Sequence, residues 1–162
     1  MSEEKTNVMR VLDQKKIPYT PHSYPHNEGE AVDGATVAAL IGRDPGEVYK
    51  TLVTRGASKA NYVFVVPVLA ELDLKKAAKT VGEKSIELIH VKELTPLTGY
   101  VRGGCSPIGM KKRFKTVIDA SAQDHAAILV SAGKIGRQVE LSPDALVGLI
   151  GGRYADVVKA DE

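Results

Sequence analysis

Apolar residues recur along the chain at two different spacings, and the change between them separates predicted helices from predicted strands. From Thr6 to Lys16 the apolar positions lie three and four residues apart, which predicts a short amphipathic helix that ends before Pro18. The period changes at Val48–Thr54 and Tyr62–Val68, and these two apolar segments flank the polar stretch RGASKAN. This arrangement is typical of two strands joined by a turn, so we expect a β-hairpin.

Three further helices and a short helical turn are predicted from their end signals. Gly42 suits the C-cap of a helix within GEAVDGATVAALIG, and Asp44-Pro45 then suits the start of another helical turn. Asp73 opens a helix that ends at Gly82, and Ser142 caps a last helix with Pro143 at its first position. The remaining extended segments are Tyr19–Tyr24, Thr116–Ile118, Ile128–Ser131 and Gln138–Leu141. Because strands outnumber long helices and do not alternate regularly with them, the predicted fold class is α+β.

Composition narrows the class of protein without indicating a function. With 162 residues, 43% of them hydrophobic and 26% charged, we expect one globular domain over residues 1–162. A net charge of +2 is too small to indicate nucleic-acid binding by itself, since phosphate binding needs local clusters of charge. No apolar stretch has bilayer length, no signal peptide is evident, and a single cysteine cannot form an internal disulfide. We therefore expect a cytoplasmic protein with no membrane association.

The segment YVRGGCSPIGMKKRF, residues 100–114, combines glycines, a proline, the single cysteine and a basic run. The Gly103-Gly104 pair and Gly109 allow the backbone to approach a ligand and can direct N–H groups at an anion or a carbonyl oxygen. A plain turn between strands has the same composition, so this motif alone is weak evidence. The run from Lys111 to Arg113 can hold a phosphate or form an ordinary solvated loop.

Neither the cysteine nor the histidines form a recognisable catalytic or metal motif. A cysteine nucleophile needs a lowered pKa and a partner base, and no histidine lies near Cys105 in the sequence. A lone cysteine is more often a small buried hydrophobic residue, so we expect Cys105 to be structural. His22 and His26 are four residues apart, but Pro21 and Pro25 oppose the helix that would give this spacing a meaning. We predict no metal.

Lys50 is unusual because it lies within a predicted apolar strand. It shares a face with Val48 and Leu52, since alternate side chains of a strand point the same way. A lysine on an apolar face extends its ammonium to water, finds a partner or serves a site. The alternative is that Lys50 protects a strand edge from unwanted pairing, which is a common use of lysine.

Four motifs occur together in the order and spacing of one known family: VYKTLV (48–53), LDLKKAAK (72–79), GGCSPIGMKKR (103–113) and VSAGKIG (130–136). Over nearly its whole length the chain resembles the YbaK/EbsC proteins, stand-alone aminoacyl-tRNA deacylases related to the editing domain inserted in bacterial prolyl-tRNA synthetases. The resemblance implies a curved, mixed, barrel-like β-sheet core surrounded by helices. It also implies hydrolysis of mischarged Cys-tRNA(Pro) in trans, with mischarged tRNA as substrate, prolyl-tRNA synthetase as a partner, and no cofactor.

The resemblance also assigns roles to individual residues. The lysine of the family's V-[FY]-K-T-L motif falls on Lys50, which is the implied catalytic residue. Cys105 falls on a variable position of the family's glycine-rich motif, whereas Ala132 and Gln138 depart from residues that many or some relatives carry. Gln138 stands where some relatives have an acid, which puts the fine amino-acid specificity in doubt. The implied substrate-binding residues are Tyr24, Thr51, Gly103, Gly104, Ser106, Pro107 and Ser131.

For the mechanism, the resemblance implies that the thiol of the cysteinyl substrate attacks its own carbonyl and releases a thiolactone. The protein then orients the ester and stabilises the oxyanion, with the N–H groups of Gly103 and Gly104 as expected donors. Two alternatives keep tRNA as the ligand: an Ala-tRNA(Pro) deacylase, and a non-catalytic module that binds the tRNA 3′ end in partnership with prolyl-tRNA synthetase. A third is a hydrolase that uses Cys105 as its nucleophile.

Overall fold

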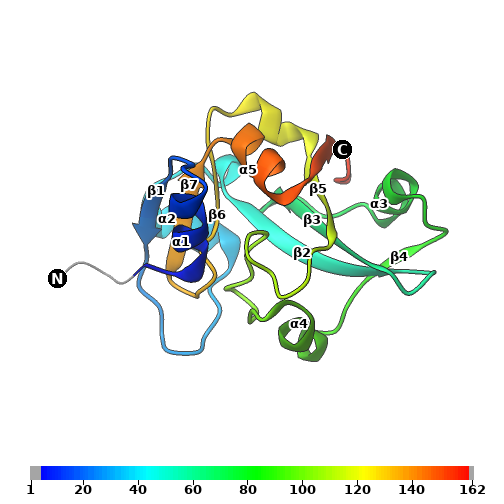
Figure 1. Cartoon of the computed structure of the whole chain (residues 1–162), viewed down its shortest axis with the longest axis horizontal. Helices are drawn as coiled ribbons and strands as arrows, with labels where there is room; N and C mark the ends of the chain where they lie inside the picture. Colours follow the sequence, from blue (N-terminus) through cyan, green and yellow to red (C-terminus); the bar gives the residue numbers. More distant parts are fainter. Residues whose placement is uncertain (1–4, 161–162) are drawn as a thin grey trace.

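The computed structural model describes residues 5–160, which form two β-sheets with helices packed around them (Figure 1). The smaller sheet is antiparallel, in the order β1 (Thr20–Ser23), β7 (Arg137–Leu141), β6 (Ile128–Ser131). The larger sheet has the order β4 (Ile86–Leu88), β2 (Tyr49–Gly56), β3 (Asn61–Pro67), β5 (Lys115–Asp119), β8 (Arg153–Ala155). It is mixed, because β3 pairs antiparallel with β2 but parallel with β5, which in turn pairs parallel with β8.

The two sheets meet at the start of β2. Val48, the residue before β2, forms an isolated parallel bridge with Leu129 of β6. The later part of β2, from Thr54 to Gly56, pairs with β4 on this same side. The result is one curved, mixed strand arrangement that does not close into a barrel. The predicted α+β class with a curved mixed sheet is confirmed.

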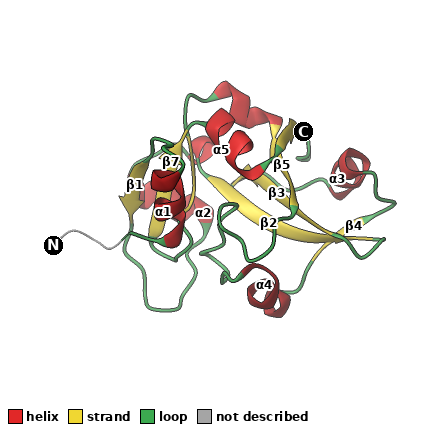
Figure 2. Cartoon of the chain, viewed as in Figure 1, coloured by secondary structure: helices red, strands yellow, loops and turns green. Residues whose placement is uncertain are grey.

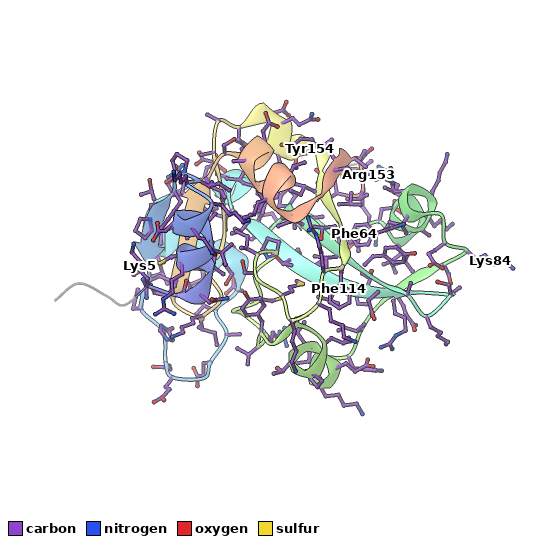
Figure 3. All side chains as sticks on the ribbon, in the orientation of Figure 1. Lys5, Phe64, Lys84, Phe114, Arg153 and Tyr154 are labelled. Carbon is purple, nitrogen blue, oxygen red and sulfur yellow. The ribbon has the colours of Figure 1, made fainter. Side chains whose placement is uncertain are left out.

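The helices cover both ends of this arrangement (Figure 2). Helices α1 (Asn7–Gln14) and α2 (Gly34–Ile41) lie beside the smaller sheet, while α3 (Leu74–Val81) and α4 (Val91–Thr98) lie at the far end, around β4. Helix α5 (Pro143–Ile150) packs near β5, and short 3-10 helices span Pro45–Glu47 and Ala120–Asp124. The buried core includes Phe64 on β3, at the centre of the molecule in Figure 3. None of the described helices has the length and apolar content needed to cross a bilayer.

The predicted helix ends are confirmed, and each uses a specific contact. The Asp73 carboxylate accepts from the N–H groups of Lys75 and Lys76, both at 3.0 Å, and the Ser142 hydroxyl accepts from Ala145 N–H. Gly42 and Gly82 adopt the left-handed conformation that ends a helix, which glycine adopts without a steric cost. These short-range contacts fix where α2, α3 and α5 begin or end.

The segments that the sequence did not predict are short or contain an interrupting residue. Strands β4 and β8 have three residues each, too few to show a period. Helix α4 contains Pro96, which argued against a helix. It forms because the Glu93 carboxylate accepts from the His90 N–H at its start, and because Gly99 ends it in the left-handed conformation.

Candidate functional site

A small cavity of about 120 Å³ lies where the two sheets meet, and we call it the site cavity. It contains five of the eight site residues predicted from the sequence, and these come from four separate stretches of chain: Tyr24, Lys50, Thr51, Gly103 and Ser131. Three further polar or titratable side chains, Tyr49, Cys105 and Gln138, also line it. The structure therefore brings most of the predicted residues together, although they span more than a hundred positions in the sequence.

Beside the site cavity, the edge of β2 that faces away from β3 is paired at both ends and open in the middle. Val48 forms its bridge with β6 at one end, and Thr54–Gly56 pair with β4 at the other. Among the described strands, none has a residue opposite Thr51 on this side. The Val53 carbonyl accepts from Ile89 N–H at 3.2 Å, and peptide groups two residues apart in a strand point to the same edge. The N–H and C=O of Thr51 therefore face the opening between β6 and β4.

Lys50 immediately precedes Thr51 on β2 and is half-buried at the border of the site cavity. Burial lowers the pKa of its ammonium, and the charge of Glu71 opposes this effect weakly. Within the described part of the chain, no carboxylate or other acceptor lies close enough to pair with this ammonium. A desolvated cation without a partner is costly unless a ligand compensates it, so Lys50 is well suited to bind an anionic or strongly polar group.

Two buried oxygen atoms in the site cavity have no hydrogen-bond partner in the described structure: Thr51 Oγ1 and Gln138 Oε1. Gln138 as a residue is only 6% exposed. Leaving such an atom unpaired costs about 1–3 kcal/mol, and native proteins seldom do so without a functional reason. The carbonyl of Gln138 can only accept, whereas the Thr51 hydroxyl can donate or accept. The site cavity therefore offers a polar ligand one fixed acceptor and one adaptable group.

Tyr24 and Ser131 line the same cavity but differ in how their polar atoms are used. The Ser131 hydroxyl accepts from Gly133 N–H at 3.1 Å, which holds the turn after β6. The backbone N–H of Tyr24 donates to the Gly136 carbonyl. Its phenolic hydroxyl has no hydrogen-bond partner among the described residues. The Tyr24 hydroxyl is thus available to a ligand.

The Gly103-Gly104 pair serves mainly to pack loops together. Gly103 has a φ of +87° at the third position of a turn that is closed by a bond from Gly104 N–H to the Val101 carbonyl at 2.9 Å. A Cβ on Gly103 would lie 2.8 Å from the Cβ of Ala31, and one on Gly104 would lie 3.0 Å from the backbone nitrogen of Ile135. The expectation that both N–H groups are free donors is therefore wrong for Gly104, whose N–H is used in the turn. Gly103 N–H has no described partner.

Two further predicted residues of the glycine-rich loop, Ser106 and Pro107, do not line the site cavity. Ser106 is fully buried and its hydroxyl accepts from Ile108 N–H at 3.2 Å, so it stabilises the loop. Pro107 lines a separate cavity of about 230 Å³, beside Lys112 and Arg113. The structure thus places the predicted residues Gly104, Ser106 and Pro107 next to the site and not in its lining.

Cys105 does line the site cavity, but its environment disfavours the reactive form. Burial raises the pKa of its thiol to about 12, with a hydrogen bond involving Thr98 acting weakly in the other direction. Neither histidine of the HSYPH segment lines the site cavity: His22 pairs with the Glu140 carboxylate at 2.8 Å, and His26 packs against Tyr24 and Gly136.

The apolar wall of the site cavity was not predicted from the sequence. This wall comes from the start of α2 and the end of β3, through Gly34, Val37 and Val68. A Cβ on Gly34 would lie 2.4 Å from the side chain of Val68, so this glycine lets α2 pack closely against the strand. The Asp-Gly-Ala-Thr pattern indicates a helix start, but no local signal shows that the helix borders a cavity.

Comparisons with known proteins identify relatives of this chain. A model described as the aminoacyl-tRNA editing domain matches residues 28–149. The chain is 46% identical over 156 residues to the EbsC protein of Enterococcus faecalis (strain ATCC 700802 / V583), named as a candidate Cys-tRNA(Pro)/Cys-tRNA(Cys) deacylase; the match covers 96% of this chain and 94% of that protein.

Two crystal structures show the same fold. One, of a candidate trans-editing enzyme for prolyl-tRNA synthetase, has a TM-score of 0.81 and 22% identity, covering 97% of this chain and 100% of that one. The other, of the hypothetical protein APE2540, has a TM-score of 0.85 and 23% identity, covering 95% and 100%. From the family match and the identity to EbsC, the chain belongs to the aminoacyl-tRNA editing domain family.

Proposed function

We propose that the protein is a trans-editing deacylase that removes cysteine from mischarged Cys-tRNA(Pro). The observation that carries this proposal is the site cavity itself: about 120 Å³, bordered by an unpaired Lys50 and containing the unpaired oxygens of Thr51 and Gln138. Such a cavity suits a small polar aminoacyl group. A synthetase pocket built for proline cannot strongly reject cysteine, since a small steric difference is worth only about 1–3 kcal/mol. A second site that accepts the small side chain supplies the missing discrimination.

In the proposed reaction the protein orients the ester and stabilises charge, and the substrate supplies the nucleophile. The sulfur of the cysteinyl thiol bonds to the carbonyl carbon of the same aminoacyl ester, and the ester C–O bond breaks. The ribose oxygen leaves with the thiol proton as a free hydroxyl, and the cysteinyl group leaves as a thiolactone. The N–H groups of Thr51 and Gly103 are the candidate oxyanion donors, because both line the cavity without another partner. The ammonium of Lys50 adds positive charge at the cavity border, and Gln138 Oε1 accepts from the substrate's α-ammonium.

Deacylation assays on four charged tRNAs test this proposal. Cys-, Ala-, Ser- and Pro-tRNA(Pro) are incubated with the wild-type protein, and loss of each ester is followed. Rapid loss of the Cys ester alone supports both the activity and the assistance by the substrate thiol. Equal rates on Ser- and Cys-tRNA(Pro) would exclude thiol assistance and favour an activated water molecule. Loss of the Ala ester alone would change the assigned substrate to Ala-tRNA(Pro).

A binding module without chemistry is the second candidate, and one observation favours it. Lys111, Lys112 and Arg113 form an exposed basic run on the same loop as Gly103, and such a run can hold the phosphates of a tRNA. Tight tRNA binding without loss of any ester would support this candidate. In either case we propose prolyl-tRNA synthetase as a partner, which co-purification of the two proteins in the presence of tRNA would test.

A further inference from the structure

A second, larger hollow lies on the other side of Lys50. It has a volume of about 570 Å³, and we call it the leucine groove. Four leucines from three parts of the chain line it: Leu52 on β2, Leu72 and Leu74 at the start of α3, and Leu88 on β4. Lys50 borders both the leucine groove and the site cavity. The two hollows are therefore neighbours, with the ammonium-bearing side chain at their common border.

The size of the two hollows determines how a charged tRNA can lie. Sites for ligands of drug or cofactor size have volumes of about 300–1,000 Å³, so the leucine groove is in this range and the site cavity, at about 120 Å³, is below it. The amino acid of a charged tRNA is esterified directly to the ribose of the terminal nucleotide. If the site cavity holds the aminoacyl group, the attached nucleotide must occupy space immediately outside it, and the leucine groove is such a space.

The apolar surface of the leucine groove is exposed in a way that suits a flat, weakly polar ligand. Leu74 is 41% and Leu88 53% exposed, although both are large hydrophobic residues. Covering such surface is favourable, because apolar area is removed from water. A nucleobase offers an apolar face and keeps its polar edges free for water, so it can cover the leucines without leaving unpaired polar atoms.

The charges around the leucine groove leave a net positive potential. Its two acids already have internal partners: Glu71 pairs with Lys159 at 2.9 Å, and Asp73 caps α3. Lys50 and Lys75 also line the groove, and within residues 5–160 neither ammonium has an ion-pair partner. The three lysines and two acids of the lining give a net formal charge of +1, and positive charge next to an apolar surface matches a group that combines a base with a phosphate.

We propose that the leucine groove binds the terminal nucleotide of the charged tRNA. Its base lies against Leu74 and Leu88, and its 5′-phosphate lies near Lys75, while the ester extends past Lys50 into the site cavity. This inference rests on the proposed function and extends it, because it assigns the position of the nucleotide that neighbours the reacting ester. It also gives the start of α3 a role in binding the substrate.

Steady-state deacylation kinetics with matched variants provide the first test. We expect the double variant Leu74→Ser, Leu88→Ser to raise KM for Cys-tRNA(Pro) about tenfold with a smaller change in kcat, since apolar contact with the base is lost. Leu69→Ser is the control, because Leu69 is 67% exposed but does not line the leucine groove.

Lys75→Ala should raise KM about threefold. Lys79→Ala should leave KM unchanged, because Lys79 is exposed on the same helix but lies outside the groove. Equal KM for the groove variants and their controls would overturn the inference.

A binding measurement tests the leucine groove even if no ester is hydrolysed. Adenosine 5′-monophosphate is titrated into isotope-labelled wild-type protein, and amide chemical shifts are followed. We expect the shifts of Leu74, Lys75 and Leu88 to move together, and to lose this response in the Leu74→Ser, Leu88→Ser variant. Shifts confined to residues 111–113, or no shifts at millimolar nucleotide, would overturn the inference. Wild-type protein that binds the nucleotide in the leucine groove but hydrolyses no ester would instead exclude the proposed deacylation while supporting the groove.

Discussion

The glycine-rich loop and strand β2 carry the two most distinctive motifs of the sequence, and the structure uses them in opposite ways. In the loop, Gly104 N–H and the Ser106 hydroxyl are both bound within the loop itself. In β2, the Thr51 hydroxyl and the Lys50 ammonium have no described partner. The loop motif, which has the composition of a ligand-binding turn, is largely a scaffold. The plainer strand motif holds the groups that are free to bind.

This difference shows that residue type alone does not identify a binding group. A hydroxyl or N–H that is paired within the protein stabilises the fold by about 0.5–1.5 kcal/mol, whereas an unpaired buried one destabilises it until a ligand binds. Substitutions in the two regions should therefore affect different properties. Loop substitutions should reduce stability, and substitutions on β2 should reduce activity. The following four experiments test this contrast, beginning with the largest expected effect.

Replacement of Lys50 should cause the largest loss of activity. We expect Lys50→Ala to lower deacylation of Cys-tRNA(Pro) about 100-fold, because a positive charge next to the developing oxyanion is removed. Thermal stability should not fall and should rise slightly, because the variant loses a desolvated ammonium that has no described partner. Since burial lowers the pKa of Lys50, wild-type activity should begin to fall at a lower alkaline pH than a solvated lysine would require. Lys79→Ala serves as the control, and full activity of Lys50→Ala would contradict the assigned role.

Gly104→Ala should destabilise the protein through close contact between two loops. The new Cβ would lie 3.0 Å from the backbone nitrogen of Ile135 and 3.1 Å from the carbonyl carbon of Lys134, so two loops must move apart. We expect a loss of about 1–3 kcal/mol in the free energy of unfolding, measured with urea. Gly148→Ala in α5 is the matched control: a Cβ there meets nothing within 4 Å, and stability should rise by about 0.5–1 kcal/mol. Equal effects of the two substitutions would show that the loop contact is not tight.

The hydroxyls of Thr51 and Ser106 allow the contrast to be tested with substitutions of similar size. Thr51→Val should leave the free energy of unfolding unchanged or raise it by about 1 kcal/mol, while KM for the charged tRNA rises about tenfold. Ser106→Ala should lower stability by about 1 kcal/mol, because Ile108 N–H loses its acceptor, with kcat per folded molecule retained. Urea unfolding and steady-state kinetics on both variants decide the question. A large loss of kcat in Ser106→Ala would instead support the substrate-binding role that the family resemblance implies.

Cys105 should give the smallest effect at neutral pH. Because the pKa of its thiol is raised to about 12, the thiol stays protonated, and Cys105→Ala should keep deacylation within about threefold of wild type. Because folding raises this pKa, the thiol's contribution to the free energy of unfolding is complete below the pKa of the unfolded thiol. This contribution declines as pH rises from about 9 towards 12. Unfolding measured between pH 8 and pH 11 should therefore depend less on pH in Cys105→Ala than in wild type. Loss of activity at pH 7 in this variant would make the thiol a reacting group.

The sequence by itself determined the helix ends, the hairpin and the fold class. Asp73, Ser142, Gly42 and Gly82 define helix ends through contacts with residues within a few positions, so a local pattern is sufficient to predict them. The position of Lys50 within an apolar strand was equally visible, because strand periodicity is local. The three-residue strands were not, because they form by pairing with distant segments, and α4 was not, because Pro96 interrupts its helical pattern.

Only the tertiary structure decided which polar groups are free. Whether Thr51 N–H is paired depends on where β4 and β6 end, and whether Gly104 approaches a ligand or another loop depends on the position of Ile135. These are relations between segments far apart in the chain. The site cavity joins Tyr24 to Gln138, and the leucine groove joins β2 to β4 and the residues near Lys159. A residue's type is written in the sequence, but its hydrogen-bond partners and its exposure exist only once distant segments have packed together.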